Sequence, residues 1–130
     1  MSGILYLTLI GLFAKHLVAD YLTQTPWMIA GKGNLRHLGG YTHAAIHSVG
    51  TIIVLLIVGM DPAFALTVAL TEFVLHYLLD FAKDHYSRGV NPSARPHLYW
   101  GLYGLDQTFH ALTYVGIVFW VDLQLPPLHP

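Results

Sequence analysis

Ionisable side chains recur at a four-residue spacing inside the most apolar parts of this sequence. The segment TEFVLHYLLDFAKD, residues 71–84, carries four of them on what would be one face of a helix: Glu72, His76, Asp80 and Asp84. Such groups are costly among leucine, valine and phenylalanine in a membrane, and there they indicate a functional site. We therefore expect helices whose polar faces meet inside the molecule.

The same spacing appears in each of the other long apolar stretches, as the pairs His16/Asp20, His43/His47 and Asp106/His110. Two such side chains one helical turn apart offer two ligands to one metal ion. The complete set of candidate metal ligands is His16, Asp20, His43, His47, His76, Asp80, Asp106 and His110. Four pairs together predict a metal site better than any one pair would.

Charge is too scarce in this chain for an ordinary soluble domain. Of the 130 residues, 55% are hydrophobic and 10% are charged, whereas soluble domains carry roughly 25% charged residues. A span needs about 20 apolar residues, and four candidate helices approach this length: residues 4–24, 43–59, 63–83 and 101–121. We expect a single all-α domain, a four-helix bundle that is integral to a membrane.

The basic residues predict how this bundle is oriented. Five of the six fall in or beside the connections 25–42 and 84–100: Lys32, Arg36, Lys83, Arg88 and Arg95. Lysine and arginine favour the cytoplasmic side, so both termini are expected on the outer side of a bacterial inner membrane. All four ligand pairs then lie within about two turns of the cytoplasmic ends of their helices.

The donor types restrict the metal. The chain has no cysteine, so only imidazole and carboxylate are available, and five histidines with three aspartates suit zinc, iron or manganese. Eight ligands suit two ions about 3.5–4 Å apart. The alternative is a network of hydrogen-bonded side chains without metal. No basic stripe indicates nucleic-acid binding.

Catalytic roles are expected for three carboxylates near these pairs. Asp20 or Asp106 would bridge the ions or act as general base, and Glu72 would orient a ligand. Lys15 is expected to neutralise an aspartate. Two further groups are expected around the site: Gln24 and Gln107 beside the ligands, and Arg88 or Arg95 to hold a phosphate.

Four segments resemble a family of small bacterial and phage membrane proteins of unknown function: KHLVADYLTQT, GGYTHAAIHS, EFVLHYLLDFAKD and GLDQTFHAL. The resemblance extends from about Phe13 to Tyr114 and implies no activity. THAAIHS and HYLLD are also similar to two signature segments of predicted inner-membrane metal-dependent hydrolases. That second resemblance implies the ligands His43, His47, His76 and Asp80.

These patterns lead to a functional hypothesis with two alternatives. The first is a metal-dependent hydrolase of a lipid or phosphoester, because the site lies at the depth of lipid headgroups. The second is a di-iron or haem oxidoreductase in the membrane. The third is a metal-binding or transport accessory subunit. The apolar surface of four short helices also predicts a homodimer or a larger membrane complex.

Overall fold

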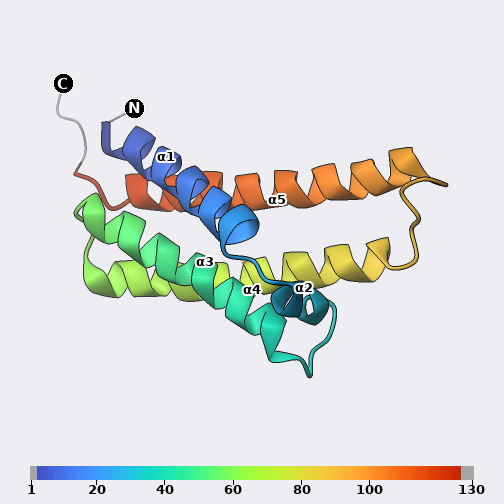
Figure 1. Cartoon of the computed structure of the whole chain (residues 1–130). Coiled ribbons are helices and arrows are strands. Elements are labelled where there is room, and N and C mark those ends of the chain that lie inside the picture. Colours follow the sequence, from blue (N-terminus) through green and yellow to red (C-terminus); the bar gives the residue numbers. More distant parts are fainter. Residues whose placement is uncertain (1–2, 127–130) are drawn as a thin grey trace.

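The computed structural model describes residues 3–126, and every regular element among them is helical (Figure 1). In chain order the elements are α1 (Gly3–Leu17), the π-helical turn η1 (Val18–Leu22), α2 (Pro26–Gly31), α3 (Leu38–Ile57), α4 (Pro62–Ser87) and α5 (Pro96–Asp122). The prediction of an all-α protein is confirmed.

The glycine-rich connection predicted over residues 25–42 contains more helix than expected. Thr25 accepts a hydrogen bond from the Met28 amide at 3.3 Å and caps the short helix α2. His37 accepts one from the Gly39 amide at 3.0 Å, so α3 begins at Leu38 instead of His43. A histidine cap is not a usual helix-start signal, which explains the difference.

The turn between α3 and α4 is built from a glycine and an aspartate cap. Gly59 adopts a φ of 85°, a left-handed conformation that glycine tolerates. Asp61 then accepts hydrogen bonds from the Ala63 and Phe64 amides at 2.9 and 3.1 Å, which caps α4 in front of the fixed φ of Pro62.

Helices α4 and α5 are longer than predicted and extend beyond the others as a hairpin (Figure 1). Each measures about 40 Å at 1.5 Å per residue, which exceeds the roughly 30 Å of a bilayer's hydrocarbon core. The predicted loop 84–100 is correspondingly shorter, because α4 continues to Ser87 and α5 begins at Pro96.

Four helices share one core. Helix α3 packs against α4, α4 packs against α5, and α1 contacts both α3 and α5, while α2 covers the first part of α3. The apolar core lies toward the end where α1 begins and α5 ends, and its fully buried members include Leu12, Leu55, Val68 and Val121. The polar ligand pairs lie beyond this core, toward the other end.

Three segments of the described chain are long and apolar enough to cross a membrane: Gly3–Leu22, Leu38–Ile57 and Pro62–Ser87. Helix α5 has the length but is less apolar, since its first 15 residues contain two tyrosines together with Asp106, Gln107 and His110. The expected four spans are therefore supported for three helices. Large apolar side chains on their outer faces are exposed, Ile57 to 78% and Ile10 to 63%.

Candidate metal centre

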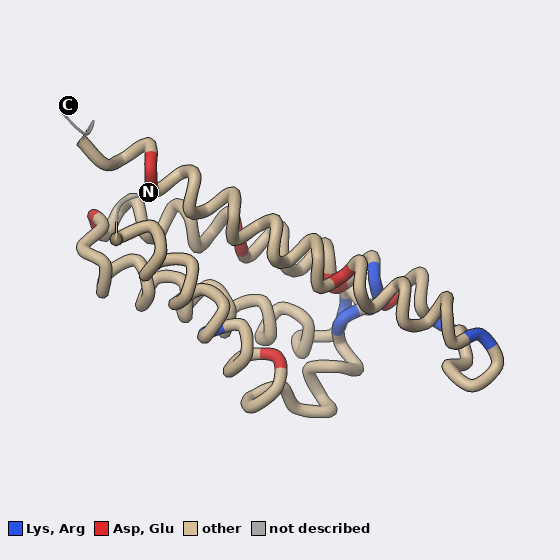
Figure 2. The backbone as a smooth tube through the Cα atoms, turned by 90° about the horizontal axis from the view of Figure 1, so that it is seen from above, with Lys and Arg blue, Asp and Glu red and all other residues tan. Residues whose placement is uncertain are grey.

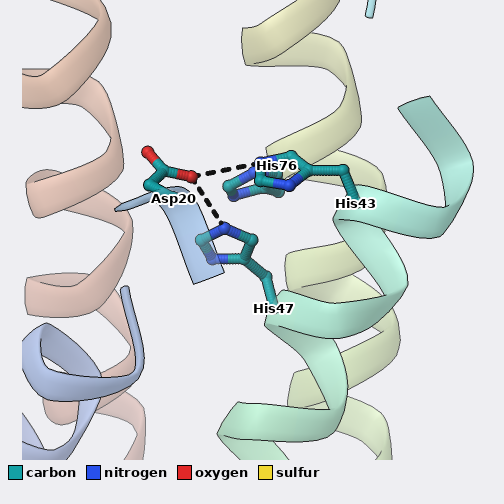
Figure 3. A group of neighbouring side chains, drawn as sticks. All are labelled: Asp20, His43, His47 and His76. Carbon is teal, nitrogen blue, oxygen red and sulfur yellow. Dashed lines mark hydrogen bonds and ion pairs between the residues drawn. The ribbon is translucent and has the colours of Figure 1, made fainter. Parts of the chain in front are cut away.

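Six of the eight candidate ligands converge in two groups that share His76. The first group contains Asp20, His43, His47 and His76, and the second contains His76, Asp80 and His110. Within each group, one donor atom per residue lies within 4.8 Å of the others. Figure 3 shows the first group, in which Asp20 faces three imidazoles from α3 and α4. All these side chains are buried or nearly so.

The carboxylate of Asp20 organises the first group. Its Oδ1 lies 3.1 Å from His43 Nε2 and 3.0 Å from His47 Nε2, which come from adjacent turns of α3. Asp20 belongs to η1, where the Thr23 amide donates to the Val18 carbonyl at 3.0 Å and widens the helix. Single π-helical turns are frequent at functional sites, and this one carries a candidate ligand.

The carboxylate of Asp80 organises the second group and links it to the first. Its Oδ2 lies 3.4 Å from His76 Nε2 and 3.5 Å from His43 Nε2, and its Oδ1 lies 3.9 Å from His110 Nε2. Helices α3, α4 and α5 thus all contribute an imidazole around this one side chain. Because His43 faces both carboxylates, the two groups form one continuous cluster.

Several ring nitrogens in this cluster have no hydrogen-bond partner within residues 3–126. These are both nitrogens of His43, Nε2 of His76 and Nε2 of His110, all on side chains exposed to 3% or less. His43 Nε2 lies close to two carboxylates, but not in the geometry of a hydrogen bond. An unpaired buried polar group costs about 1–3 kcal/mol. A cation among these atoms would remove that cost, so the donor set fits a metal ion.

His110 has the tautomer that a metal ligand requires. Its Nδ1 lies 2.8 Å from the main-chain carbonyl oxygen of Asp106, which only accepts, so Nδ1 carries the proton and donates it. The Nε2 lone pair is then directed toward the Asp80 side of the cluster. Orientation of a ligating histidine by a carbonyl is the usual arrangement around protein metals.

Asp106 and His16 lie beside the two groups, outside them. The Asp106 carboxylate is 3.5 Å from His110 Nδ1, and it accepts a hydrogen bond from the side-chain nitrogen Nε2 of Gln107 at 3.1 Å. His16 Nε2 contacts the Gln107 side-chain oxygen at 3.1 Å and Asp20 at 3.3 Å, and its Nδ1 is 2.8 Å from the Tyr114 hydroxyl. Both residues brace ligands in this geometry, and ligation by either one stays a prediction.

Glu72 belongs to a buried ion pair next to the first group. One of its oxygens contacts Lys15 Nζ and the other accepts from the Thr51 hydroxyl. Lys15 also donates to the His47 carbonyl at 3.2 Å and lies 3.4 Å from His47 Nδ1. Lys15 therefore neutralises a glutamate rather than the expected aspartate. Lys15 thus connects Glu72 to His47, and the predicted catalytic role of Glu72 stays a prediction.

Lys32 is the residue that sequence reasoning missed. Its Nζ lies 2.9 Å from Asp80 Oδ2, although the sequence identified it only as a loop charge. Helix α2 carries Lys32 to this position because glycines let it approach α3 closely. A Cβ on Gly31 would lie 2.5 Å from the Gly40 nitrogen, and one on Gly40 would lie 2.8 Å from the Gly31 oxygen. In the sequence, Gly31 and Gly40 were the signal that two segments of this connection could pack closely.

A polar pocket of about 140 Å³ opens beside the cluster. Its wall includes Asp20, Gln24, Lys32, Lys83, Tyr103, Asp106 and Gln107. Neither arginine expected to hold phosphate lines it. Arg88 is exposed and pairs with Asp84 at 2.9 Å and with the Gly33 carbonyl at 3.1 Å. The basic groups facing this pocket are instead the two lysines.

Comparison with known proteins identifies a family. A family model with the description "Protein of unknown function (DUF3307)" matches residues 8–126. Neither the curated proteins nor the solved structures include a match to the chain. The matched region contains every residue of the two groups and of the polar pocket. The chain belongs to the DUF3307 family of proteins of unknown function.

Proposed function

We propose that α1, α3, α4 and α5 span a bacterial inner membrane as a four-helix bundle, with both chain termini on the outer side. Three of the helices have the required length and hydropathy, and α5 is held between α1 and α4. Figure 2 supports the orientation: most basic residues gather toward the α4–α5 hairpin, whereas α1 begins and α5 ends at the opposite end.

We further propose that the cluster holds two divalent ions, zinc, iron or manganese. One ion takes Asp20, His43 and His47, and the other takes His76, Asp80 and His110, since one imidazole nitrogen serves a single ion. Three protein ligands per ion leave positions open, which is typical of catalytic sites. The observation that carries this proposal is the set of buried imidazole nitrogens without hydrogen-bond partners around two carboxylates.

Charge supports cation binding as well. Lys15 offsets Glu72 and Lys32 offsets Asp80. Asp20 and Asp106 have no lysine or arginine in a salt bridge within the described chain. Buried carboxylates without a counter-charge are strongly unfavourable. Divalent ions in the cluster supply that counter-charge.

The activity that this site supports best is hydrolysis of a phosphoester at the cytoplasmic face. Divalent ions supply a water of lowered pKa and stabilise charge on the phosphoryl oxygens. Asp106, on the pocket wall, accepts the proton of the attacking water, while Lys32 and Lys83 hold the phosphate. The water oxygen would bond to phosphorus as the ester P–O bond breaks, and the leaving alkoxide would take the proton that Asp106 accepted and depart as the alcohol.

A di-iron oxidoreductase is the second candidate, because the cluster is rich in imidazole and has no thiolate. Purified protein of this type would be coloured, whereas a zinc hydrolase would be colourless. Transport is the weaker alternative. A conducting path would have to cross the apolar core at the outer end, where Leu12, Leu55 and Val121 are fully buried.

Metal content and turnover test this proposal together. Purified protein should retain zinc, iron or manganese by elemental analysis, and His76→Ala should lose the ion that His76 would share with Asp80 and His110. His85→Ala is the matched control, since His85 is exposed on the same helix. A panel of phosphoesters should be hydrolysed by the wild type and by His85→Ala, and not by His76→Ala. Metal-free wild-type protein, or turnover that survives in His76→Ala, would contradict the proposal.

A further inference from the structure

Three adjoining cavities follow the interface between α4 and α5. The first, of about 420 Å³, is almost wholly apolar, and its lining includes Leu75, Leu79, Phe109, Leu112, Gly116 and Trp120. The second, of about 200 Å³, shares Leu79 and Phe109 with the first. It also shares Lys83 and Asp106 with the polar pocket. The row of apolar cavities thus ends at Lys83 and Asp106, and the polar pocket lies on the other side of these two residues.

The apolar part of this row has the length of a lipid chain. From Val68 to Lys83 on α4 the first and second cavities together extend about 22 Å at 1.5 Å per residue. This length exceeds one leaflet, which is half of a hydrocarbon core of about 30 Å, and it stays within the full core. The side chains along its rim face outward, with Leu75 exposed to 43%, Phe109 to 50% and Leu112 to 56%. An acyl chain could enter sideways from the membrane.

The first cavity can hold an apolar chain although Glu72 is part of its lining. The residue lines the first cavity but is only 1% exposed. Both of its carboxylate oxygens are engaged, one by Lys15 and one by Thr51. The floor of the groove is therefore a neutralised pair, and its accessible surface is hydrocarbon.

The polar end of the row combines two lysines with two carboxylates, Asp20 and Asp106, whose charge a bound metal ion would offset. Lys32 and Lys83 line the polar pocket, and its volume of about 140 Å³ corresponds to roughly five water molecules at about 30 Å³ each. A phosphate group fits this volume, whereas a large headgroup does not.

The first and second cavities together form a groove along α4 and α5, which we call the α4–α5 groove. We infer that this groove holds the acyl chain of a lipid phosphomonoester whose phosphate lies between Lys32 and Lys83. This inference rests on the proposed hydrolase and names its substrate class. The occupant is a lipid because the groove is apolar, its rim is exposed, and it ends at Lys83, which also lines the polar pocket. A helix from a second copy of the chain would cover the groove without using the polar pocket.

Contact between a lipid chain and Trp120 tests this binding without any turnover. Trp120 lines the groove, and the chain contains two other tryptophans, Trp27 and Trp100. With both replaced by phenylalanine, Trp120 becomes the only tryptophan. The metal-stripped protein in nanodiscs then receives a low fraction of phosphatidic acid or phosphatidylcholine with brominated chains, which quench tryptophan on contact. Phosphatidic acid should quench more strongly.

Filling the groove should abolish this preference. A Cβ on Gly116 meets no atom within 4 Å, so Gly116→Phe places a ring in the first cavity without a backbone clash. Gly101→Phe is the control, because Gly101 is equally open on the same helix but lines none of the three cavities. Lys83→Gln should weaken phosphatidic acid binding by about tenfold, the value of one charge-assisted hydrogen bond.

The results test the lipid site and the hydrolase separately. Equal quenching by both lipids means general membrane contact and overturns the inference, as does unchanged preference in Gly116→Phe. Absence of quenching by either lipid indicates that protein covers the groove, which also overturns it. Selective quenching without hydrolysis in metal-loaded protein would retain the lipid site and reject the hydrolase. Hydrolysis of soluble phosphoesters without selective quenching would retain the hydrolase and reject the lipid site.

Discussion

Lys32 and His43 approach the same carboxylate oxygen, Oδ2 of Asp80, at 2.9 and 3.5 Å. Lys32 is a covalently attached cation at this position, whereas the imidazole of His43 offers a lone pair to a metal ion that can bind and leave. Both ring nitrogens of His43 lack hydrogen-bond partners within the described chain. The ammonium group of Lys32 would therefore compete with a bound metal ion for Asp80, and it also adds positive charge to the polar pocket.

Removing this lysine should strengthen metal binding. Lys32→Gln eliminates a positive charge beside the cluster, and the expected rise in zinc affinity is about tenfold or more at an effective dielectric constant near 20. Competition with a chromophoric chelator measures it. Arg36→Gln removes an equal charge from an exposed position nearby and should leave the affinity unchanged. Weaker zinc binding by Lys32→Gln would show that the lysine supports the site instead.

At the scale of elements, the sequence predicted the long helices because their apolar stretches are long, and it predicted the ligand pairs because the four-residue spacing matches a helical turn. It missed η1, since no residue between Val18 and Leu22 distinguishes a π-helical turn from an α-helical one. It also missed α2 and the contact of Lys32, because these depend on how two glycine-containing segments approach in space.

The close contact between α2 and α3 should therefore control Lys32. Gly31→Val places side-chain atoms where the backbone of Gly40 now lies, and such overpacking typically costs about 1–3 kcal/mol. We expect α2 to move outward and the zinc affinity to rise as in Lys32→Gln, measured by the same chelator competition. Gly101→Val, at an open helical position, is the control. Affinity at the wild-type level in Gly31→Val would mean that Lys32 keeps its place without this packing.

At the scale of the whole molecule, polarity is distributed along the helix axes. The apolar core lies toward the end where α1 begins, and the cluster and the polar pocket lie beyond it. Most basic residues lie toward the α4–α5 connection, away from the beginning of α1 and the end of α5 (Figure 2). Hydropathy and the positive-inside rule predicted this arrangement, because both reflect general costs of placing residues in a bilayer. The α4–α5 groove could not be predicted, since it depends on which side chains leave space between two packed helices.

The proposed orientation can be tested with cysteines, because the chain has none of its own. Ser93→Cys lies in the α4–α5 connection and Gln124→Cys follows α5. A membrane-impermeant maleimide should label Ser93→Cys only in inverted vesicles and Gln124→Cys only in right-side-out vesicles. Labelling of both positions from one side would contradict the four-span arrangement.

The buried apolar core at the outer end has a consequence for how products would leave. Leu12, Leu55 and Val121 are fully buried at that end, so in the proposed enzyme inorganic phosphate would leave through the polar pocket into the cytoplasm. The dephosphorylated lipid would instead move laterally from between α4 and α5 into the inner leaflet. The two products would thus leave in different directions, phosphate into the cytoplasm and lipid into the plane of the membrane, and neither would cross the bilayer.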